Sequence, residues 1–581
     1  MFNNQLTINH YKKQLIKNKY TVVVLIGLFS LLIYTRFVNL GWGLPYPMHP
    51  DERNMAAALQ QLSCKEFSII NFQLSIKNCF NPHFFAYGQF PLYLAYIGIW
   101  VWKLFSNNIN PISFNEATLA LRIISAIVSV INVGVLLKII LLLNLKFKIS
   151  NFKLKISSLL IFTLVPYAIQ FSHFGTTESL LMLFYSLIIY FSLQLFKGKI
   201  LNSKFIILNS IITGLALATK VSSIWFILVP TIAIVFSNVS KINKLKSLIQ
   251  FTLTSLLITV IFSPYNLIDL SNFLSSMRYE SDVALGRYVA FYTRQFTETV
   301  PVIFQSTKIF PYALGCSIFI LGLLGLFGLS WKNKDYNLLR FAFFIYFIPN
   351  AFVFAKWTRF MAPAMSILLL FAVLFLLEIK VIKIIKIIII IISILPGLAY
   401  LAIYQNPDIR FQASDWIYKN IPENSKILSE TANVIDIPII PNNNYKDYKS
   451  YKILSFDFYN VDESLALRYD LQKAIGEADY IFVPSRRIWA NHTCIQVQSS
   501  KFKVQSESEK CKELKENYPI LNQYYKDLFS GKLGFTLIKE FESYPKIEIF
   551  SKTIYKIPDE TAEETWSVFD HPVIRIYKRK L

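Results

Sequence analysis

Two adjacent carboxylates, Asp51 and Glu52, stand in the segment YPMHPDERNMA (46–56), directly after a long apolar run. A third acid, Glu178, lies in SHFGTTESLLMLF, at the start of another apolar run. A carboxylate beside lipid and beside a like charge has a raised pKa, which suits a general base that removes a proton from a nucleophile. We therefore predict Asp51, Glu52 and Glu178 as catalytic residues.

Four basic side chains stand at the ends of other apolar runs. They are Arg122 in LALRIISA, Lys220 in GLALATKVSS, and Lys356 and Arg359 in KWTRFMAPA. Lys and Arg bind phosphate oxygens and stabilise negative charge that develops on a leaving oxygen. A ring of acids and cations at one depth could activate a nucleophile and hold an anionic leaving group.

The elements that must position these side chains are membrane helices. Of the 581 residues, 54% are hydrophobic and 16% aromatic, which is unusual for a soluble chain of this size. The sequence predicts a polytopic α-helical membrane protein with about eleven transmembrane helices. The predicted spans are 20–38, 119–142, 156–172, 177–195, 205–219, 221–237, 247–263, 311–330, 338–354, 361–377 and 387–404.

The net charge of +23 comes largely from lysines in short loops between apolar runs, such as Lys146, Lys148, Lys153 and Lys155. Cytoplasmic loops retain lysine in this way, so the charge indicates orientation and not a nucleic-acid partner. It places the N-terminus in the cytoplasm and the candidate site residues at the outer face. The first outer loop would be 39–118 and the second large outer loop 264–310.

The segment FPLYLAYIGIWVWKLF, 90–105, could be a twelfth span. Crossing there would turn most lysine clusters to the outside. Because the segment begins with a proline and ends in two tryptophans and a lysine, we predict a helix that lies in the membrane interface.

The composition changes after residue 404. YKILSF, ADYIFVP and VIRIYKR are typical of strands, and the stretches 410–420 and 463–476 of helices. We predict two parts, a transmembrane domain over 1–404 and an extracytoplasmic α/β domain over 405–581.

Four of the five cysteines form two pairs on the predicted outer face, Cys64 with Cys79 and Cys494 with Cys511. Disulfides in an oxidising compartment and free thiols both fit this spacing.

The order of motifs resembles the lipid-linked-sugar glycosyltransferases of the GT-C fold. It is similar, in particular, to the protein O-mannosyltransferase and aminoarabinose transferase group, glycosyltransferase family 39 and its relatives. The resemblance covers roughly residues 20–404 and rests on five motifs in order. They are HPDE after the first span together with NPHFFAYGQFPLYL, then LRIISA, HFGTTESLL, LATKVSS and KWTRFMAP.

This resemblance implies an inverting glycosyltransferase of the plasma membrane that moves a sugar from a polyprenyl-phosphate carrier to an acceptor at the outer face. It implies that Asp51 activates the acceptor, and that Lys220, Lys356, Arg359 or Arg122 contact the carrier phosphate. The acceptor could be a protein, a lipid or a glycan. The chain departs from the family at Gln89-Phe90, where some relatives have an acid and a lysine, and at Phe360, which replaces a tyrosine.

Several of these candidate residues could have a structural role instead of a catalytic or phosphate-binding one. We expect Asp51 to cap the helix that begins after Pro50, and capping does not exclude catalysis. Glu52 could instead tune Asp51, and the three cations Lys220, Lys356 and Arg359 could snorkel to the bilayer surface.

The alternative function is a transporter or flippase of lipid-linked glycans. It is disfavoured because the charges lie at one surface and the chain shows no internal repeat. A membrane-anchored scaffold would not need so many spans. No metal ligand set is predicted, since His49, His83 and His173 lack helical spacing, but a divalent metal cofactor stays open.

Overall fold

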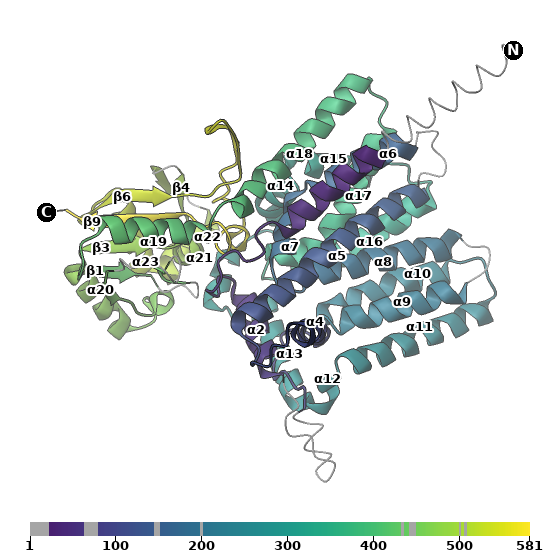
Figure 1. Ribbon diagram of the computed structural model, residues 1–581, viewed down its shortest axis with the longest axis horizontal. Coiled ribbons are helices and arrows are strands. Elements are labelled where there is room, and N and C mark those ends of the chain that lie inside the picture. Colours follow the sequence, from purple (N-terminus) through teal and green to yellow (C-terminus); the bar gives the residue numbers. More distant parts are fainter. Residues whose placement is uncertain are drawn as a thin grey trace, which may run out of the picture.

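The computed structural model describes residues 22–62, 79–143, 151–197, 202–430, 435–440, 449–498, 501–504 and 508–580. Figure 1 shows two parts: long helices at one end of the molecule, and a small sheet with shorter helices at the other.

Several of the described helices could cross a membrane. Five are long and apolar enough, or up to seven if each of two bent helix pairs counts as one span. The five are α5 (Phe114–Leu143), α8 (Glu178–Lys197), α11 (Lys241–Phe262), the stretch Thr358–Glu378 that contains α17 (Ala362–Glu378), and α18 (Lys383–Gln405). The chain is therefore a multi-pass membrane protein.

By length and apolar character, the described residues contain five to seven candidate spans, fewer than the eleven that the sequence predicts. Three predicted spans, 20–38, 205–219 and 221–237, are shorter apolar helices here: Val22–Phe37, α9 (Ser203–Leu217) and the stretch Val221–Val235. The predicted span 338–354 corresponds to α16 (Lys334–Phe352), which begins with charged residues and is absent from the candidates.

The two bent pairs break at residues that disfavour a straight helix. In the first pair Pro166 begins α7 (Pro166–His173), which is bent by 53° from the helix before it. In the second pair Gly315, at φ +80°, separates the stretch Gln305–Ala313 from α15 (Cys316–Gly328), bent by 114°. A positive φ is readily adopted only by glycine.

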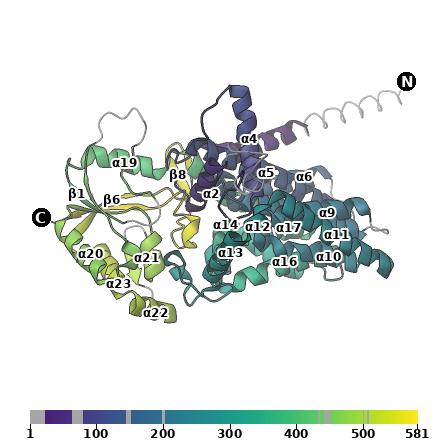
Figure 2. The same cartoon turned by 90° about the horizontal axis from the view of Figure 1, so that it is seen from below.

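The segment predicted to lie in the interface forms α4 (Phe90–Ser106). Figure 1 looks almost along its axis, whereas α5, α8 and α9 lie lengthwise, and in Figure 2 α4 stands across them. A helix across the direction of the spans has the orientation expected in a membrane interface.

The C-terminal part contains a five-stranded sheet in the order β2-β1-β3-β9-β6. Its strands are β2 (Lys452–Leu454), β1 (Lys426–Ser429), β3 (Tyr480–Val483), β9 (Ile574–Arg579) and β6 (Phe535–Phe541). β1 is parallel to β2 and β3, whereas β9 is antiparallel to β3 and β6.

Both faces of this sheet are buried. In β3, Tyr480 and Phe482 pack with α19 (Ile409–Asn420), whereas Ile481 and Val483 pack with α23 (Pro519–Ser530) on the opposite face. This alternation follows from the two-residue period of a strand. The strands predicted in YKILSF, ADYIFVP and VIRIYKR and the two predicted helices occur in the structure, as β2, β3, β9, α19 and α20 (Leu465–Glu477).

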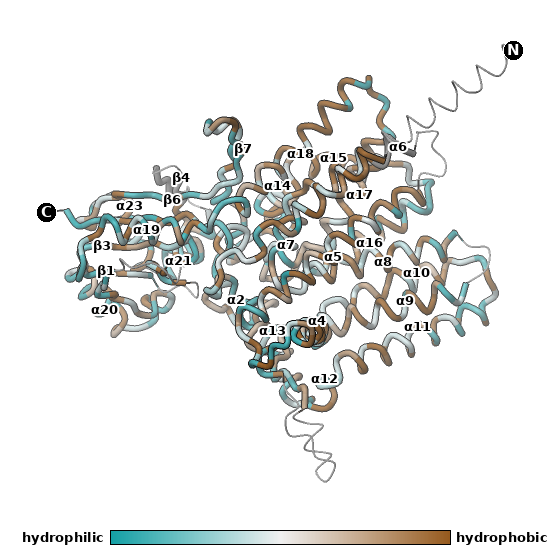
Figure 3. The backbone as a smooth tube through the Cα atoms, in the orientation of Figure 1, coloured by the Kyte–Doolittle hydropathy of each residue, from teal (hydrophilic) through white to brown (hydrophobic). Residues whose placement is uncertain are grey.

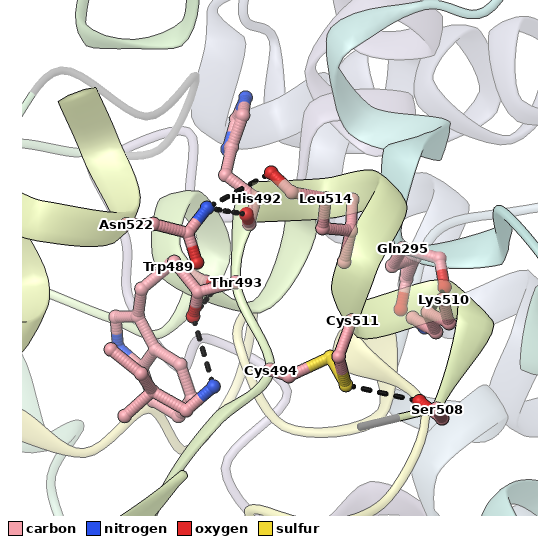
Figure 4. The surroundings of a disulfide bond; sticks show 11 residues. Gln295, Trp489, His492, Thr493, Cys494, Ser508, Lys510, Cys511, Leu514 and Asn522 are labelled. Carbon is pink, nitrogen blue, oxygen red and sulfur yellow. Dashed lines mark hydrogen bonds between the residues drawn. A yellow bond between two sulfur atoms is a disulfide. The ribbon is translucent and has the colours of Figure 1, made fainter. Parts of the chain in front are cut away.

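A disulfide joins Cys494 to Cys511. Figure 4 shows that Cys494 follows α21 (Arg487–His492) and that Cys511 lies on α22 (Glu509–Asn517), where Ser508 contacts its sulfur. Cys79 is also disulfide-bonded, while its predicted partner Cys64 lies outside the described residues.

The chain after β8 (Lys552–Lys556) returns to the helical part. Ala562, Trp566, Val568 and Phe569 belong to the same hydrophobic core as the membrane helices. An extracytoplasmic domain over 405–581 stays a prediction, and the structure adds that the strand-free segment 557–571 packs into the helical core.

Candidate active site

Asp51 lies in the first turn of α2 (Pro50–Gln61), which follows the helix Val22–Phe37. The expectation that Asp51 caps α2 was wrong: His49 is the N-cap, and its Nδ1 accepts from the N–H of Glu52 at 3.5 Å. The cap lies before Pro50 because proline fits the first helical position, where no N–H is needed. Asp51 is thereby left free of the capping contact.

Asp51 forms an ion pair with Arg359, which lies in a short 3₁₀ turn (Thr358–Met361) just before α17. The two side chains are 21% and 22% exposed, so neither is fully removed from solvent. Arg359 also lies over the ring of Trp357, 4.6 Å from its centroid, which orients the guanidinium.

Glu178 and Lys220 form a second pair, with 3.6 Å between Oε1 and Nζ. Glu178 begins α8, and Lys220 lies in the tight turn after α9. The ammonium is 5.0 Å from the ring centroid of Tyr87 and 5.4 Å from that of Phe360. Phe360, which stands where the family has tyrosine, thus forms part of the wall around Lys220.

One cavity brings the two pairs together. Asp51, Arg359 and Glu178 line it, and Lys220 is paired with Glu178 without lining the cavity itself. We call this cavity the site pocket. It lies where the start of α2, the start of α8 and the Thr358–Met361 turn meet.

Glu52 and Arg122 do not line the site pocket. They form a buried two-point ion pair, with Arg122 Nε and Nη2 donating to Glu52 at 2.7 and 2.6 Å. Arg122 Nη1 donates to the carbonyls of Leu40 and Trp42, and the N–H of Gly175 donates to Glu52. The side chains are 0% and 1% exposed, so in this arrangement neither is open to a ligand.

Lys356 lies away from the site pocket. It is buried, its Nζ donates to the carbonyl of Phe354 at 3.2 Å, and burial lowers its pKa. Of the seven predicted residues, the structure groups Asp51, Arg359, Glu178 and Lys220, pairs Glu52 with Arg122, and leaves Lys356 apart.

The site pocket also contains residues that the sequence did not single out for this role. His49 is one of them, and burial, together with the charge of Arg359, holds its pKa well below the usual value. A neutral His49 that accepts at Nδ1 carries its proton on Nε2 and can donate one hydrogen bond from there. His49 is the first residue of the HPDE motif and was visible in the sequence, but its role as cap was not.

The C-terminal segment closes one wall of the site pocket. Thr565 and Phe569 line it, more than five hundred residues along the chain from Asp51. Glu563 holds this segment against the Arg359 turn, because its carboxylate accepts from the N–H of Thr358 at 3.0 Å and from its hydroxyl at 2.9 Å. No local sequence signal marks such a long-range contact.

Within the described parts of the chain, no three His, Cys, Asp or Glu side chains gather as a metal site would require. The charged side chains that line the site pocket are the carboxylates of Asp51 and Glu178 and the guanidinium of Arg359.

No family model and no curated protein matches the chain. Among solved structures, ArnT from Cupriavidus metallidurans bound to undecaprenyl phosphate is similar with a TM-score of 0.43 and 15% identity, covering 70% of this chain and 66% of that one. The apo oligosaccharyltransferase of Archaeoglobus fulgidus is similar with a TM-score of 0.46 and 10% identity, covering 97% and 89%. The chain thus spans just under two thirds of the ArnT chain. ArnT belongs to the aminoarabinose transferase group that the motifs resemble.

Proposed function

We propose that this chain is an inverting glycosyltransferase that moves a sugar from a polyprenyl-phosphate carrier to an acceptor hydroxyl or amine at the outer face of the plasma membrane. The observation that carries the proposal is the ion pair of Asp51 with Arg359 in a pocket that Glu178 also lines, with Lys220 paired to Glu178. The five sequence motifs support it as well.

The ion pair between Asp51 and Arg359 suggests how the reaction begins. Without substrate, the carboxylate and the guanidinium satisfy each other. A carrier phosphate competes for Arg359 and so frees Asp51 for the acceptor. Charge-assisted bonds of Arg to phosphate are strong, which favours this exchange.

Bond making and breaking then follow. The acceptor oxygen or nitrogen attacks the anomeric carbon while the bond from that carbon to the phosphate oxygen breaks. Asp51 takes the acceptor proton, and the phosphate leaves with the bonding electrons. Arg359 and Lys220 stabilise the charge that grows on the leaving oxygen. A single displacement of this kind inverts the configuration. Glu178 holds Lys220 in place, and Glu52 with Arg122 fixes α2.

The test is release of carrier phosphate by the full chain in lipid bilayers that contain a panel of polyprenyl-phosphate sugars and an acceptor extract. Asp51→Asn keeps the shape of the side chain and removes the base, so we expect release to be lost. Asp335→Asn is the matched control, because Asp335 is also paired with a lysine, Lys197 at 3.2 Å, but lies at the start of α16 away from the site pocket.

Full release by Asp51→Asn would exclude Asp51 as the base. Movement of the labelled lipid across the bilayer, with no release in wild type, would favour the transporter or flippase alternative.

A further inference from the structure

A short hairpin in the C-terminal part carries apolar side chains that no described residue covers. It consists of β7 (Lys546–Ile549) and β8, which pair only with each other among the described strands. We call it the β7–β8 hairpin. At its tip Phe550 is fully exposed, at 100%, and Ile554 and Ile549 are 62% and 50% exposed.

The hairpin lies beside a membrane span. Figure 1 shows it rising from the sheet next to α18, and Figure 3 shows the same hairpin, labelled β7, with hydrophobic residues toward its end. Tyr555 and Pro545 line a cavity together with Ile392 and Pro396 of α18. Ile392 precedes the end of α18 by thirteen residues, about 20 Å of helix. The base of the hairpin therefore lies beside α18 and not beyond its end.

The face of α18 near the hairpin is itself apolar and exposed. Ile388, Ile391 and Ile392 are 47%, 49% and 50% exposed on a helix long and apolar enough to cross a membrane. In a membrane this face contacts lipid. The exposed apolar tip belongs to a hairpin whose base lies beside this helix, and exposed apolar surface of this kind marks an interaction site.

The charged residues of the hairpin suit a position at the boundary between headgroups and acyl chains. Lys546 is paired with Glu548 at 2.9 Å, and Lys552 lies one residue beyond the turn. Lysines beside apolar residues place their stems in lipid and their ammonium groups among phosphates. The outer edges of a two-stranded sheet carry unpaired backbone groups, which excludes the centre of the bilayer and allows its interface.

We propose that the tip of the β7–β8 hairpin inserts into the leaflet on the side of the C-terminal sheet, at the headgroup boundary beside α18. The occupant of the exposed surface is lipid. β8 leads directly into the segment 557–571, whose Thr565 and Phe569 line the site pocket, so the inserted hairpin also holds this wall of the pocket at a fixed membrane depth.

A spin label at position 550 tests the insertion in the full chain reconstituted in lipid nanodiscs. Phe550→Cys is made in a Cys316→Ser background, because Cys316 is the free cysteine of the described residues. Power saturation then compares collisions with oxygen, which partitions into lipid, and with a water-soluble nickel chelate. We expect oxygen to collide more often than the chelate.

The matched control is Leu465→Cys in the same background. Leu465 is also apolar, is 80% exposed, and lies at the start of α20 in the C-terminal part. We expect the reverse ratio there. Equal ratios at the two positions would overturn the proposal.

A second spin label at Ile554 tests whether the result at position 550 reflects the whole hairpin and not a local effect of that one label. An oxygen preference at both 550 and 554 in nanodiscs, lost when the nanodisc lipid is replaced by a short-chain detergent, supports insertion. A chelate preference at both positions overturns it.

Discussion

The ion pairs Asp51–Arg359 and Glu52–Arg122 differ in how far they are exposed to solvent. Asp51 and Arg359 are each about one fifth exposed, whereas Glu52 and Arg122 are completely enclosed and have every partner supplied by the protein. A pair that is open to solvent can exchange partners with a substrate. An enclosed pair of this kind fixes the position of α2 against α5.

Glu52→Gln tests the enclosed pair. The amide leaves Arg122 buried without a counter-charge, and we expect the free energy of unfolding to fall by about 3–5 kcal/mol. Thermal unfolding in detergent measures this loss. The control is Asp415→Asn in the exposed pair with Lys419, 2.7 Å apart, where less than about 1 kcal/mol is expected. Equal losses in both variants would contradict the assignment.

Arg359 should act in the proposed reaction as a stabiliser of the leaving phosphate. We expect Arg359→Met to lower kcat about 100-fold, because one donor to the developing charge is removed. Arg359→Lys keeps the charge but not the two-point geometry, so its loss should be smaller. Carrier-phosphate release measures both. An unchanged kcat in Arg359→Met would remove Arg359 from the mechanism.

The close packing of helices α15 and α17 depends on glycine. α15 and α17 approach so closely that a Cβ on Gly325 would lie 2.3 Å from the carbonyl oxygen of Phe371. A small residue at such a crossing lets the two backbones meet, which is a common device in membrane helices. The arrangement supports α17, and the Arg359 turn lies directly before this helix.

Gly325→Ala should therefore push α15 and α17 apart and cost about 1–3 kcal/mol of stability. Gly328→Ala in the same helix is the control, because its Cβ would meet only the ring of Phe375, at 3.9 Å. Melting temperatures in detergent compare the two. A lower melting temperature for Gly328→Ala than for Gly325→Ala would contradict this packing argument.

A buried cluster of polar side chains joins the two parts of the molecule, the C-terminal segment and the membrane helices. His571 lies between Asp570, at 2.6 Å, and Asp559, at 2.8 Å. Asp570 also accepts from the hydroxyls of Tyr400 and Tyr404 on α18, at 2.9 and 2.8 Å. Burial opposes the charge on His571, but the two aspartates outweigh it and raise its pKa to about 10.

This cluster makes stability depend on pH. The pKa of His571 in the folded chain lies above the usual value near 6.5, so its contribution is fully present below about pH 6.5 and declines as the pH rises toward 10. We expect the melting temperature of wild type to fall over this window. His571→Asn should reduce the slope, whereas His83→Asn, at an exposed histidine, should keep it. Parallel pH profiles for wild type and His571→Asn would contradict this prediction.

Much of the architecture follows from local pattern. Runs of apolar residues predicted α5, α8, α11, α17 and α18, and short β-rich runs predicted β3 and β9, because burial in lipid or in a sheet acts on each segment alone. The sequence also singled out Asp51, Glu178, Lys220 and Arg359 as candidates, because charged residues at the ends of apolar runs are conspicuous in any arrangement of the helices.

Tertiary structure decided what each charge faces. Glu52 and Arg122 form an enclosed pair instead of lining the pocket, and Lys356 turns aside to a backbone carbonyl. His49 rather than Asp51 caps α2, and Thr565 and Phe569 come from the far end of the chain to close the pocket. A spacing along the chain places a charge on an element, but the partner of that charge depends on which other elements pack beside it, and this packing is set by contacts hundreds of residues apart.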